Sequence, residues 1–509
     1  MARAPDVLIA GAGPTGLALA LQAHTHGARV RIVERRPDPF RRSRAAMVHI
    51  RTLEVLRPLG VVDALLERAA ADPGFTLHGG HRTAHLGLGR IAIADTPYPH
   101  LTLLRQADVE SVLGEALAER GIPIERGTEV VDLADPADPR VTLRAAGGSV
   151  TTQCGFLAGC DGVDSIVRSL AGIGWSGGSY SREIVLADLD IAGLDPDSSH
   201  VAVGPAGMVF AFRLGEGASW RLLATRPAGS TAGGGHASTG ATGAVSVPVR
   251  ELAALLTAAE MPGQITDVAW SAAIRLRYGR ADSYRRGQVF LAGDAAHVHS
   301  PAGGQGMNTG IQDAINLGWK LAYSPRSRRS DDLLDSYEVE RRGIARIGQV
   351  LTDALFWAES ATDPAAAAVR RMVAWCGPTL APAALSMRPL VAELMRIVSQ
   401  LWISYRGGPM VVLPAVRQLN QVRAGDRLPD AAIETTCGPA RLHDLLAEPG
   451  FHLLLDRDAE EPSSVGASVH LHRLTTPGTG VITVRPDGYA GLVAAGRADV
   501  EHWLAAVGA

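Results

Sequence analysis

Three short segments of the chain carry residues whose types and spacing suit the binding of one dinucleotide. The first is Gly11-Ala-Gly-Pro-Thr-Gly16, the second is Gly159-Cys-Asp-Gly162, and the third runs from Gly293-Asp-Ala-Ala-His297 to Thr309. Glycine permits tight turns and a close approach of the backbone to a ligand, and carboxylates accept hydrogen bonds from ligand hydroxyl groups. Only the first segment has the GxGxxG pattern, so we expect the later segments to contact the same cofactor.

The GxGxxG run is placed as a phosphate-binding turn should be. Residues 7–10 suit a buried parallel strand, a helix is expected as far as His26, and residues 29–34 form the next strand. In such a βαβ unit the first glycine makes the tight turn, the second admits a pyrophosphate and the third lets helix and strand pack closely. Glu34 ends the second strand, where a carboxylate holds ribose hydroxyls and disfavours a 2′-phosphate.

The composition indicates a globular chain without strongly charged partners. Of 509 residues, 46% are hydrophobic and 20% are charged, and the formal net charge is −3. A nearly neutral chain creates no field that gathers nucleic acid or an anionic membrane, and apolar stretches are too short for export or membrane insertion. We expect no disulfide framework, no metal site and a cytoplasmic location, because no CxxC pair occurs among Cys154, Cys160, Cys376 and Cys437.

The order of expected elements predicts a chain of mixed α/β and α+β class. Parallel-strand and helix patterns occur at both ends of an inserted region with the alternating pattern of an antiparallel sheet. A smaller α/β unit ends the chain. The expected ranges are 1–174 and 287–405 for a Rossmann-like domain with a helical region, 175–286 for the inserted sheet domain, 406–425 for a linker and 426–509 for the last unit.

In their order and spacing, the three segments resemble those of the FAD-dependent aromatic hydroxylases, the para-hydroxybenzoate hydroxylase family of class A flavoprotein monooxygenases. The resemblance covers about residues 5–345. It implies that ranges 1–174 and 287–405 bind non-covalent FAD and that range 175–286 binds the substrate. It also implies NAD(P)H as co-substrate, with NADPH favoured.

The C-terminal part is similar to the bacterial aromatic-polyketide hydroxylases of anthracycline and angucycline pathways. The similarity rests on Tyr337-Glu-Val-Glu-Arg-Arg342, Ile403-Ser-Tyr-Arg-Gly-Gly408, Gly425-Asp-Arg-Leu-Pro-Asp430 and Val484-Arg-Pro-Asp-Gly488. It implies a thioredoxin-like domain over residues 426–509. Because that domain has no CxxC, we expect it to support the structure rather than perform thiol chemistry. Relatives that act on rifamycins, phenols or tetracyclines remain open.

The resemblance also implies which residues form the site. Asp161 corresponds to a position that contacts both FAD and NAD(P)H, and Asp294 corresponds to the carboxylate that binds ribityl or ribose hydroxyls. The residues expected to bind the cofactor are Gly11, Gly13, Pro14, Thr15, Gly16, Glu34, Arg35, Arg44, Gln106, Asp161, Asp294, Pro301, Gly304, Gly306, Met307 and Asn308. The expected substrate pocket lies near Met47, Phe210, Phe212, Trp220 and Pro301. No catalytic side chain is named.

The function that the resemblance implies is insertion of one oxygen atom from O₂ into an aromatic polyketide or a phenol through a flavin hydroperoxide, with hydroxylation as the expected outcome. Baeyer-Villiger oxidation, epoxidation and antibiotic inactivation remain alternatives on the same fold. A flavin oxidase or dehydrogenase without oxygen insertion is a rival from another class, and a flavin protein that sequesters a polyketide is a third. The chain is expected to be a monomer or a homodimer.

Overall fold

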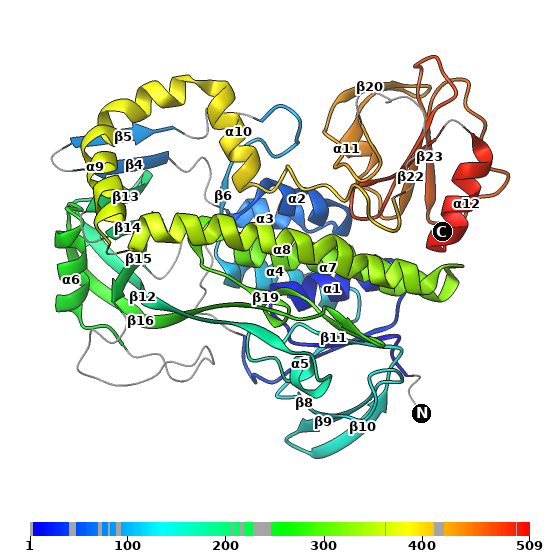
Figure 1. Ribbon diagram of the computed structural model, residues 1–509, viewed down its shortest axis with the longest axis horizontal. Coiled ribbons are helices and arrows are strands. Elements are labelled where there is room, and N and C mark those ends of the chain that lie inside the picture. Colours follow the sequence, from blue (N-terminus) through cyan, green and yellow to red (C-terminus); the bar gives the residue numbers. More distant parts are fainter. Residues whose placement is uncertain are drawn as a thin grey trace.

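The computed structural model shows a chain folded around two large sheets (Figure 1). It describes residues 4–39, 47–69, 74–79, 82–87, 93–204, 207–213, 218–227, 246–361, 363–411, 422–494 and 496–509. The mixed α/β and α+β class expected from the sequence is confirmed.

A six-stranded sheet forms the base of the first region. Its order is β17-β18-β11-β1-β2-β7, and every neighbouring pair is parallel except β17 and β18. All residues of β1 and β18 are buried, because helices and loops cover both faces of a parallel sheet. The strands are β1 (Val7–Ala10), β2 (Val30–Glu34), β7 (Ile124–Arg126), β11 (Phe156–Gly159), β17 (Arg285–Arg286) and β18 (Val289–Leu291).

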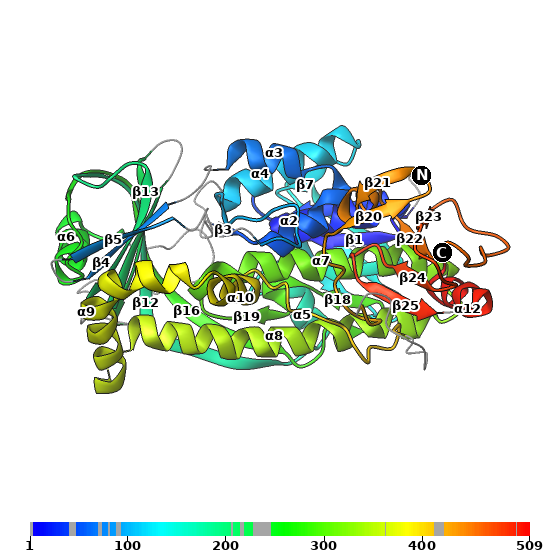
Figure 2. The same ribbon diagram turned by 90° about the horizontal axis from the view of Figure 1, so that it is seen from above.

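A layer of helices packs on this sheet. Helix α1 (Pro14–Thr25) follows β1 and packs against α4 (Gln106–Glu119) and α7 (Gln305–Tyr323). The long helix α8 (Ser330–Ser360) lies beside α7 along much of the molecule (Figure 2). Short helices complete the region: α2 (Ile50–Leu56), α3 (Val62–Arg68) and α5 (Ile166–Leu170).

The second large sheet has eight strands in the order β19-β16-β12-β15-β14-β13-β4-β5. Strands β12 and β16 are each 18 residues long and pair antiparallel. The strands are β4 (Gly74–Gly79), β5 (Arg82–Leu86), β12 (Trp175–Ala192), β13 (Ser198–Gly204), β14 (Gly207–Arg213), β15 (Trp220–Pro227), β16 (Gln264–Ala281) and β19 (His297–Val298). This sheet therefore extends beyond the range 175–286 expected from the sequence, since β4, β5 and β19 lie outside that range.

Smaller elements surround the two sheets. The hairpin strands β8 (Glu129–Leu133), β9 (Arg140–Ala145) and β10 (Gly148–Gln153) form a three-stranded sheet, and β3 (Met47–Val48) pairs with β6 (Thr102–Leu103). Helix α6 (Val249–Ala258) packs on β16, and α9 (Pro364–Ser386) packs on β4, β5 and β13 before α10 (Arg388–Val398). Among the described residues, no helix is both long and apolar enough to span a bilayer.

The last unit has a thioredoxin-like sheet. Its order is β23-β22-β24-β25, with β22 parallel to β23 and antiparallel to β24. The connection from β22 to β23 contains no helix, unlike a regular βαβ crossover. The elements are β20 (Ala432–Thr435), β21 (Gly438–Arg441), α11 (Leu442–Leu445), β22 (Phe451–Leu455), β23 (Val469–Arg473), β24 (Val481–Val484), β25 (Ala490–Ala494) and α12 (Arg497–Val507).

Buried charges join this unit to α7 and α8. Glu340 of α8 accepts hydrogen bonds from Lys320 Nζ at 2.7 Å and from Arg485 Nη1 at 2.7 Å, and all three side chains are fully buried. Asn316 Nδ2 donates to Glu340 Oε2 at 2.7 Å and to Asp487 Oδ2 at 2.9 Å. Burial alone would raise the pKa of Glu340, but Arg485 and Lys320 hold that pKa well below its usual value. The carboxylate therefore stays ionised inside the protein.

Replacing Glu340 with Gln should lower the free energy of unfolding by about 3–5 kcal/mol, because the change leaves buried cations without their counter-charge. The matched control is Glu115→Gln, since Glu115 pairs with Arg68 at 2.8 Å on the surface with its side chain 54% exposed. That change should cost less than about 1 kcal/mol. Urea unfolding of both variants measures the difference, and equal midpoints would contradict the structural role of Glu340.

Candidate active site

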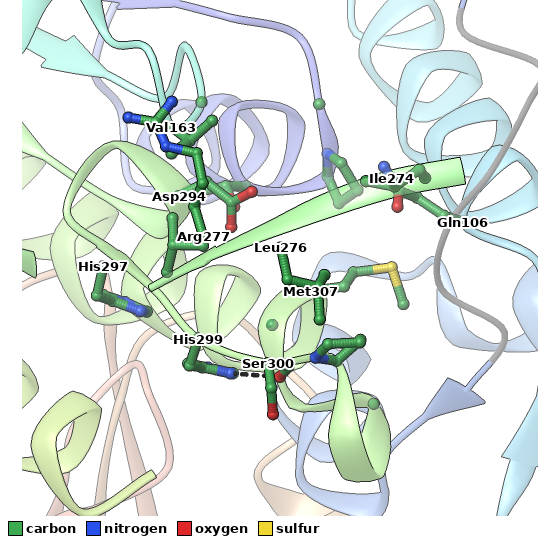
Figure 3. Close-up of a pocket in the computed structure, with 18 of the residues that line it drawn as sticks. Gln106, Val163, Ile274, Leu276, Arg277, Asp294, His297, His299, Ser300 and Met307 are labelled. Atoms are coloured by element: carbon green, nitrogen blue, oxygen red, sulfur yellow. Dashed lines mark hydrogen bonds between the residues drawn. The ribbon is translucent and has the colours of Figure 1, made fainter. Parts of the chain in front are cut away.

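One continuous cavity of about 650 Å³ connects the six-stranded sheet with the eight-stranded sheet. At one end it is lined by the loop after β1 and by the end of β2, and at the other end by β12, β14, β15 and β16. Figure 3 shows side chains from four separate parts of the chain, Gln106, Val163, Asp294 and Met307, around this space. A single elongated ligand or two adjoining ligands can therefore occupy it.

The GxGxxG loop has a backbone that only glycine permits at two positions. Gly11 has a φ of +103°, and a Cβ there would lie 2.3 Å from the carbonyl oxygen of Cys160. A Cβ on Gly16 would lie 1.9 Å from the carbonyl oxygen of Gly11. Gly16 is not among the lining residues, so it supports the loop from behind. Pro14 and Thr15 begin α1 and line the cavity.

Gly13 differs from these two glycines. A Cβ on Gly13 would meet no protein atom within 4 Å, and its φ of −79° is open to any residue. Because Gly13 lines the cavity, the space beside it is available to a ligand. Gly306, in the first turn of α7, likewise lines the cavity, and a Cβ there would meet no protein atom within 4 Å beyond the helix itself.

Glu34 lies at the end of β2, as the sequence predicts, and lines the cavity. Its Oε2 accepts a hydrogen bond from the backbone N–H of Ala12 and its Oε1 accepts one from Arg36, each at 2.9 Å. Burial alone would raise the pKa of Glu34, but these backbone donors and the Arg36 guanidinium lower it. The neighbouring Arg35 is exposed at the cavity wall.

Asp161 and Gln106 both line the cavity. Asp161 Oδ2 accepts from the backbone N–H groups of Ile166 at 2.8 Å and Val167 at 3.2 Å, and Oδ1 accepts from Ser165 Oγ at 2.5 Å. Burial raises the pKa of Asp161, although these hydrogen bonds oppose the shift. Gln106 Nε2 donates to Glu110 at 2.8 Å. Both predicted residues therefore border the cavity and also serve the local structure. Arg44 lies outside the described residues.

Asp294 of the third segment and Asp313 of α7 have different surroundings. Asp294 is exposed and lines the cavity, and no hydrogen bond or ion pair joins its carboxylate to another residue within the described ranges. Asp313 is fully buried and accepts from His297 Nε2 at 2.6 Å and from Arg341 Nε at 2.7 Å. Asp294 can therefore receive ligand hydroxyl groups, whereas Asp313 holds the segment against α7 and α8.

A glycine cradle, defined as Gly303 to Gly306, lies at the N-terminus of α7. Gly303 and Gly304 have φ values of +71° and +64°, in the left-handed region that favours glycine. The helix that follows presents unpaired backbone N–H groups and the positive end of its dipole to the cavity. Pro301, Gly304, Gly306 and Met307 line the cavity around it.

Asn308 does not line the cavity, although the sequence suggested that it binds the cofactor. Its Oδ1 accepts from the His49 N–H at 2.8 Å and from Thr52 Oγ1 at 2.7 Å, and its Nδ2 donates to the Gly304 carbonyl at 2.8 Å. Asn308 is fully buried. It therefore shapes the cradle and leaves contact with a ligand to its neighbours.

The substrate end follows the alternation of β-strand side chains. Phe210 and Phe212 of β14 face the cavity, as does Met47. Trp220 does not: it is 3% exposed and packs with Leu222 and Ala224 in the core on the opposite face of β15. The structure thus corrects the placement of Trp220, because alternate residues of a strand point to opposite faces.

Several lining residues were missed from the sequence. On β15 the cavity face consists of Arg221, Leu223 and Thr225, and the neighbouring strands add Ile184, Ile274, Leu276 and Arg277. One feature of the sequence could have indicated this face: Arg221 and Thr225 are polar residues of a mostly apolar strand, and their separation by an even number of positions places them on the same face. Glu359, at the end of α8, also lines the cavity, and no sequence motif around it indicates this position.

The walls therefore fit an FAD molecule. The open position at Gly13 matches a pyrophosphate, and the carboxylate of Asp294 matches the hydroxyl groups of a ribityl chain. The N-terminus of α7, where Gly306 leaves open space, matches an electron-accepting ring.

Comparison with known proteins agrees with this fit. The FAD binding domain family matches residues 4–351. A flavin-dependent monooxygenase of Mycobacteroides abscessus is 32% identical over 517 residues, covering 98% of this chain and 99% of the relative. The 6-methylpretetramide 4-monooxygenase of Streptomyces rimosus is 36% identical over 402 residues, covering 77% of this chain and 67% of the relative.

A solved structure is similar over the whole chain. The ternary complex of aklavinone-11 hydroxylase with FAD and aklavinone has a TM-score of 0.76 at 25% identity, covering 100% of this chain and 99% of that chain. The chain belongs to the FAD-binding family of flavin-dependent aromatic monooxygenases.

Proposed function

We propose that this monooxygenase uses FAD, NAD(P)H and O₂ to hydroxylate a polycyclic aromatic substrate of the polyketide type or a related phenol. The single observation that carries the proposal is the continuous cavity from the GxGxxG loop to a wall of aromatic and aliphatic side chains. The names of the relatives, which include a tetracycline-type monooxygenase and an aklavinone hydroxylase, support the substrate class.

The residues assigned to FAD follow the walls of the cavity. Gly11, Gly13 and the start of α1 hold the pyrophosphate, Glu34 holds the adenosine ribose and Asp294 holds ribityl hydroxyls. The flavin, when bound, carries electrons from NAD(P)H to O₂ and delivers oxygen to the substrate ring. The first turn of α7 stabilises negative charge at its end of the cavity, because its N–H groups are unpaired and fixed in place.

The substrate half of the cavity positions a flat ring and excludes water. Apolar surfaces come from four strands of one sheet, through Phe210, Phe212, Leu223, Ile184 and Ile274. A ring held there lies between the sheet and the glycine cradle, so orientation and exclusion of water are the contributions of the protein.

NADPH is the favoured reductant. The chain has one GxGxxG run, so NAD(P)H binds only transiently and without a dinucleotide domain of its own. Arg35 is exposed and lines the cavity, where its guanidinium group would attract a 2′-phosphate. We place the enzyme in the cytoplasm, as a monomer or homodimer; the four free cysteines suit a reducing compartment.

Replacing Gly13 with Val should abolish FAD binding while the chain still folds. The backbone at Gly13 accepts a side chain and no protein atom lies near its Cβ, so the added atoms enter only the space of the pyrophosphate. Flavin absorbance after purification measures the loss, and circular dichroism measures folding. Gly16→Ala is the contrasting control, because its Cβ would overlap the Gly11 carbonyl and should impair folding. Full flavin content in Gly13→Val would overturn the assignment.

Replacing Asp294 with Ala should weaken FAD binding by about tenfold to a hundredfold. A hydrogen bond to a charged group contributes roughly 1.5–3 kcal/mol, and 1.4 kcal/mol corresponds to tenfold. The melting temperature of the apoprotein should stay unchanged, because the carboxylate has no partner among the described residues. Asp313→Ala should instead lower that temperature by breaking the contacts with His297 and Arg341. A destabilised Asp294→Ala apoprotein with unchanged FAD affinity would indicate a structural role.

NADPH oxidation should be slow without substrate and accelerate when a polycyclic phenol binds, because the transient nicotinamide site must form beside a flavin that changes position. Stopped-flow measurement of flavin reduction, with and without a tetracyclic or angular aromatic ligand, tests the acceleration. With ¹⁸O₂, one labelled oxygen should enter the product. Equal rates with every aromatic compound, together with no labelled product, would identify a flavin oxidase instead.

A further inference from the structure

Helix α8 brings one carboxyl group into the substrate half of the cavity. Leu355 and Glu359 are one helical turn apart, and both line the cavity. Leu355 Cδ1 lies 3.8 Å from the position that a Cβ on Gly303 would take, so Leu355 marks the glycine cradle. Side chains at this spacing have Cβ atoms about 5–6 Å apart. Glu359 therefore lies one turn beyond the cradle, toward the eight-stranded sheet.

The end of α8 that carries Glu359 packs against the eight-stranded sheet. The carbonyl oxygen of Glu359 lies 3.6 Å, and Thr225 Oγ1 lies 3.2 Å, from the position of a Cβ on Gly207, which places the end of α8 against β14 and β15. Phe210 and Leu223 line the cavity on these same strands. In the described part of the chain, no hydrogen bond or ion pair joins the Glu359 carboxyl group to another residue. A partly buried carboxyl group thus faces a cavity without a protein partner.

The elements around this end of the cavity carry several arginines, including Arg182 of β12, Arg221 of β15, Arg275 of β16 and Arg370 of α9. Arg182 Nη2 donates to Thr225 Oγ1 at 3.2 Å, and Arg221 donates two hydrogen bonds of 2.8 Å to Asp188. Arg370 Nη1 donates to the Ala358 carbonyl at 3.0 Å, and Arg275 is exposed. None of these guanidinium groups forms an ion pair with Glu359 in the described residues, and burial raises the pKa of the Glu359 carboxyl group to about 7.

Two buried glutamates, Glu54 and Glu340, have evident structural roles. Glu54 forms ion pairs with Arg51 and Arg427, and Glu340 forms ion pairs with Lys320 and Arg485. The Glu359 carboxyl group has no such partner among the described residues, and charge is costly to bury without one. The difference favours a ligand as the partner of Glu359.

We propose, on the basis of the proposed function, that Glu359 is a catalytic and specificity-determining residue whose carboxylate binds a hydroxyl group of the aromatic substrate and accepts its proton. The O–H bond of the phenol breaks, and a new O–H bond forms on Glu359 Oε. The electron pair stays on the phenolate oxygen and enriches the ring that accepts oxygen. The proton returns to the product or leaves to water, so the step needs no oxidant or reductant.

Binding of 2-naphthol and its methyl ether to the FAD-loaded enzyme tests this proposal without NADPH or turnover. At pH 8, where the carboxyl group is ionised, the wild-type enzyme should bind 2-naphthol about tenfold to a hundredfold more tightly than the ether. The preference should fall as the pH is lowered through about 7, since protonation removes the charged acceptor. Glu359→Gln should bind the two ligands almost equally at both ends of this range.

Asp332→Asn is the matched control, because Asp332 is a carboxylate on the exposed first turn of the same helix and pairs with Arg329. It should keep the preference and its pH dependence. An unchanged preference in Glu359→Gln would overturn the proposal. If that variant fails to fold or loses FAD, the wild-type titration decides: a preference that does not change between pH 5.5 and 8, with 2-naphthol or with a hydroxyanthraquinone and its ether, would overturn it too.

The binding assay also separates this inference from the proposed function. If phenol recognition depends on Glu359 but no aromatic ligand stimulates NADPH oxidation, the monooxygenase proposal fails and the binding site stands. If ligands stimulate oxidation and incorporation of oxygen while Glu359→Gln keeps the preference for the hydroxyl group, only the role of Glu359 is overturned.

Discussion

Helix α7 is buried at every residue from Asn308 to Tyr323, and both large sheets and the C-terminal unit are arranged around it. Its N-terminus opens onto the cavity, and the preceding Gly303 and Gly304 adopt left-handed backbone conformations that favour glycine. Its polar residues must then find partners inside the protein, since an unpaired buried polar group costs free energy. Asp313 is satisfied by His297 and Arg341, and Lys320 is satisfied by Glu340.

This arrangement explains how one cavity serves two chemical tasks. The carboxyl ends of β1 and β2 and the N-terminus of α7 make one end suited to phosphates, hydroxyl groups and negative charge. The antiparallel sheet makes the other end apolar, because one face of β14 and β15 is turned inward while the opposite face packs against α6. The glycine cradle lies between these two parts of the cavity. A flavin monooxygenase needs its cofactor and the ring of its substrate to come together at such a place.

Much of the site could be predicted from the sequence because its signals are local. The GxGxxG run, Glu34 at the end of a strand and Asp294 after a glycine each depend on a few consecutive residues. Features that depend on contacts between distant segments are harder to predict from the sequence. The sequence places Trp220 on a strand of the inserted sheet, but the direction of its side chain depends on the strand register. The motif indicates Asn308 as a cofactor residue, but its side-chain oxygen accepts hydrogen bonds from His49 and Thr52. The position of Glu359 at the cavity depends on the path of the long helix α8, which no local pattern reveals. Likewise, no local pattern indicates that β4 and β5 belong to a sheet formed mostly by residues later in the chain.

The buried cluster of Asn316, Lys320, Glu340, Arg485 and Asp487 makes the C-terminal unit more than an appended module. Two of its five members come from the unit and three from the helices that form the flavin region. Shortening the gene before residue 426 would leave Lys320 and Glu340 facing water from positions shaped for an enclosed contact. Loss of this unit would therefore leave buried charges of α7 and α8 without their partners, so the helices of the first region and the C-terminal unit depend on each other.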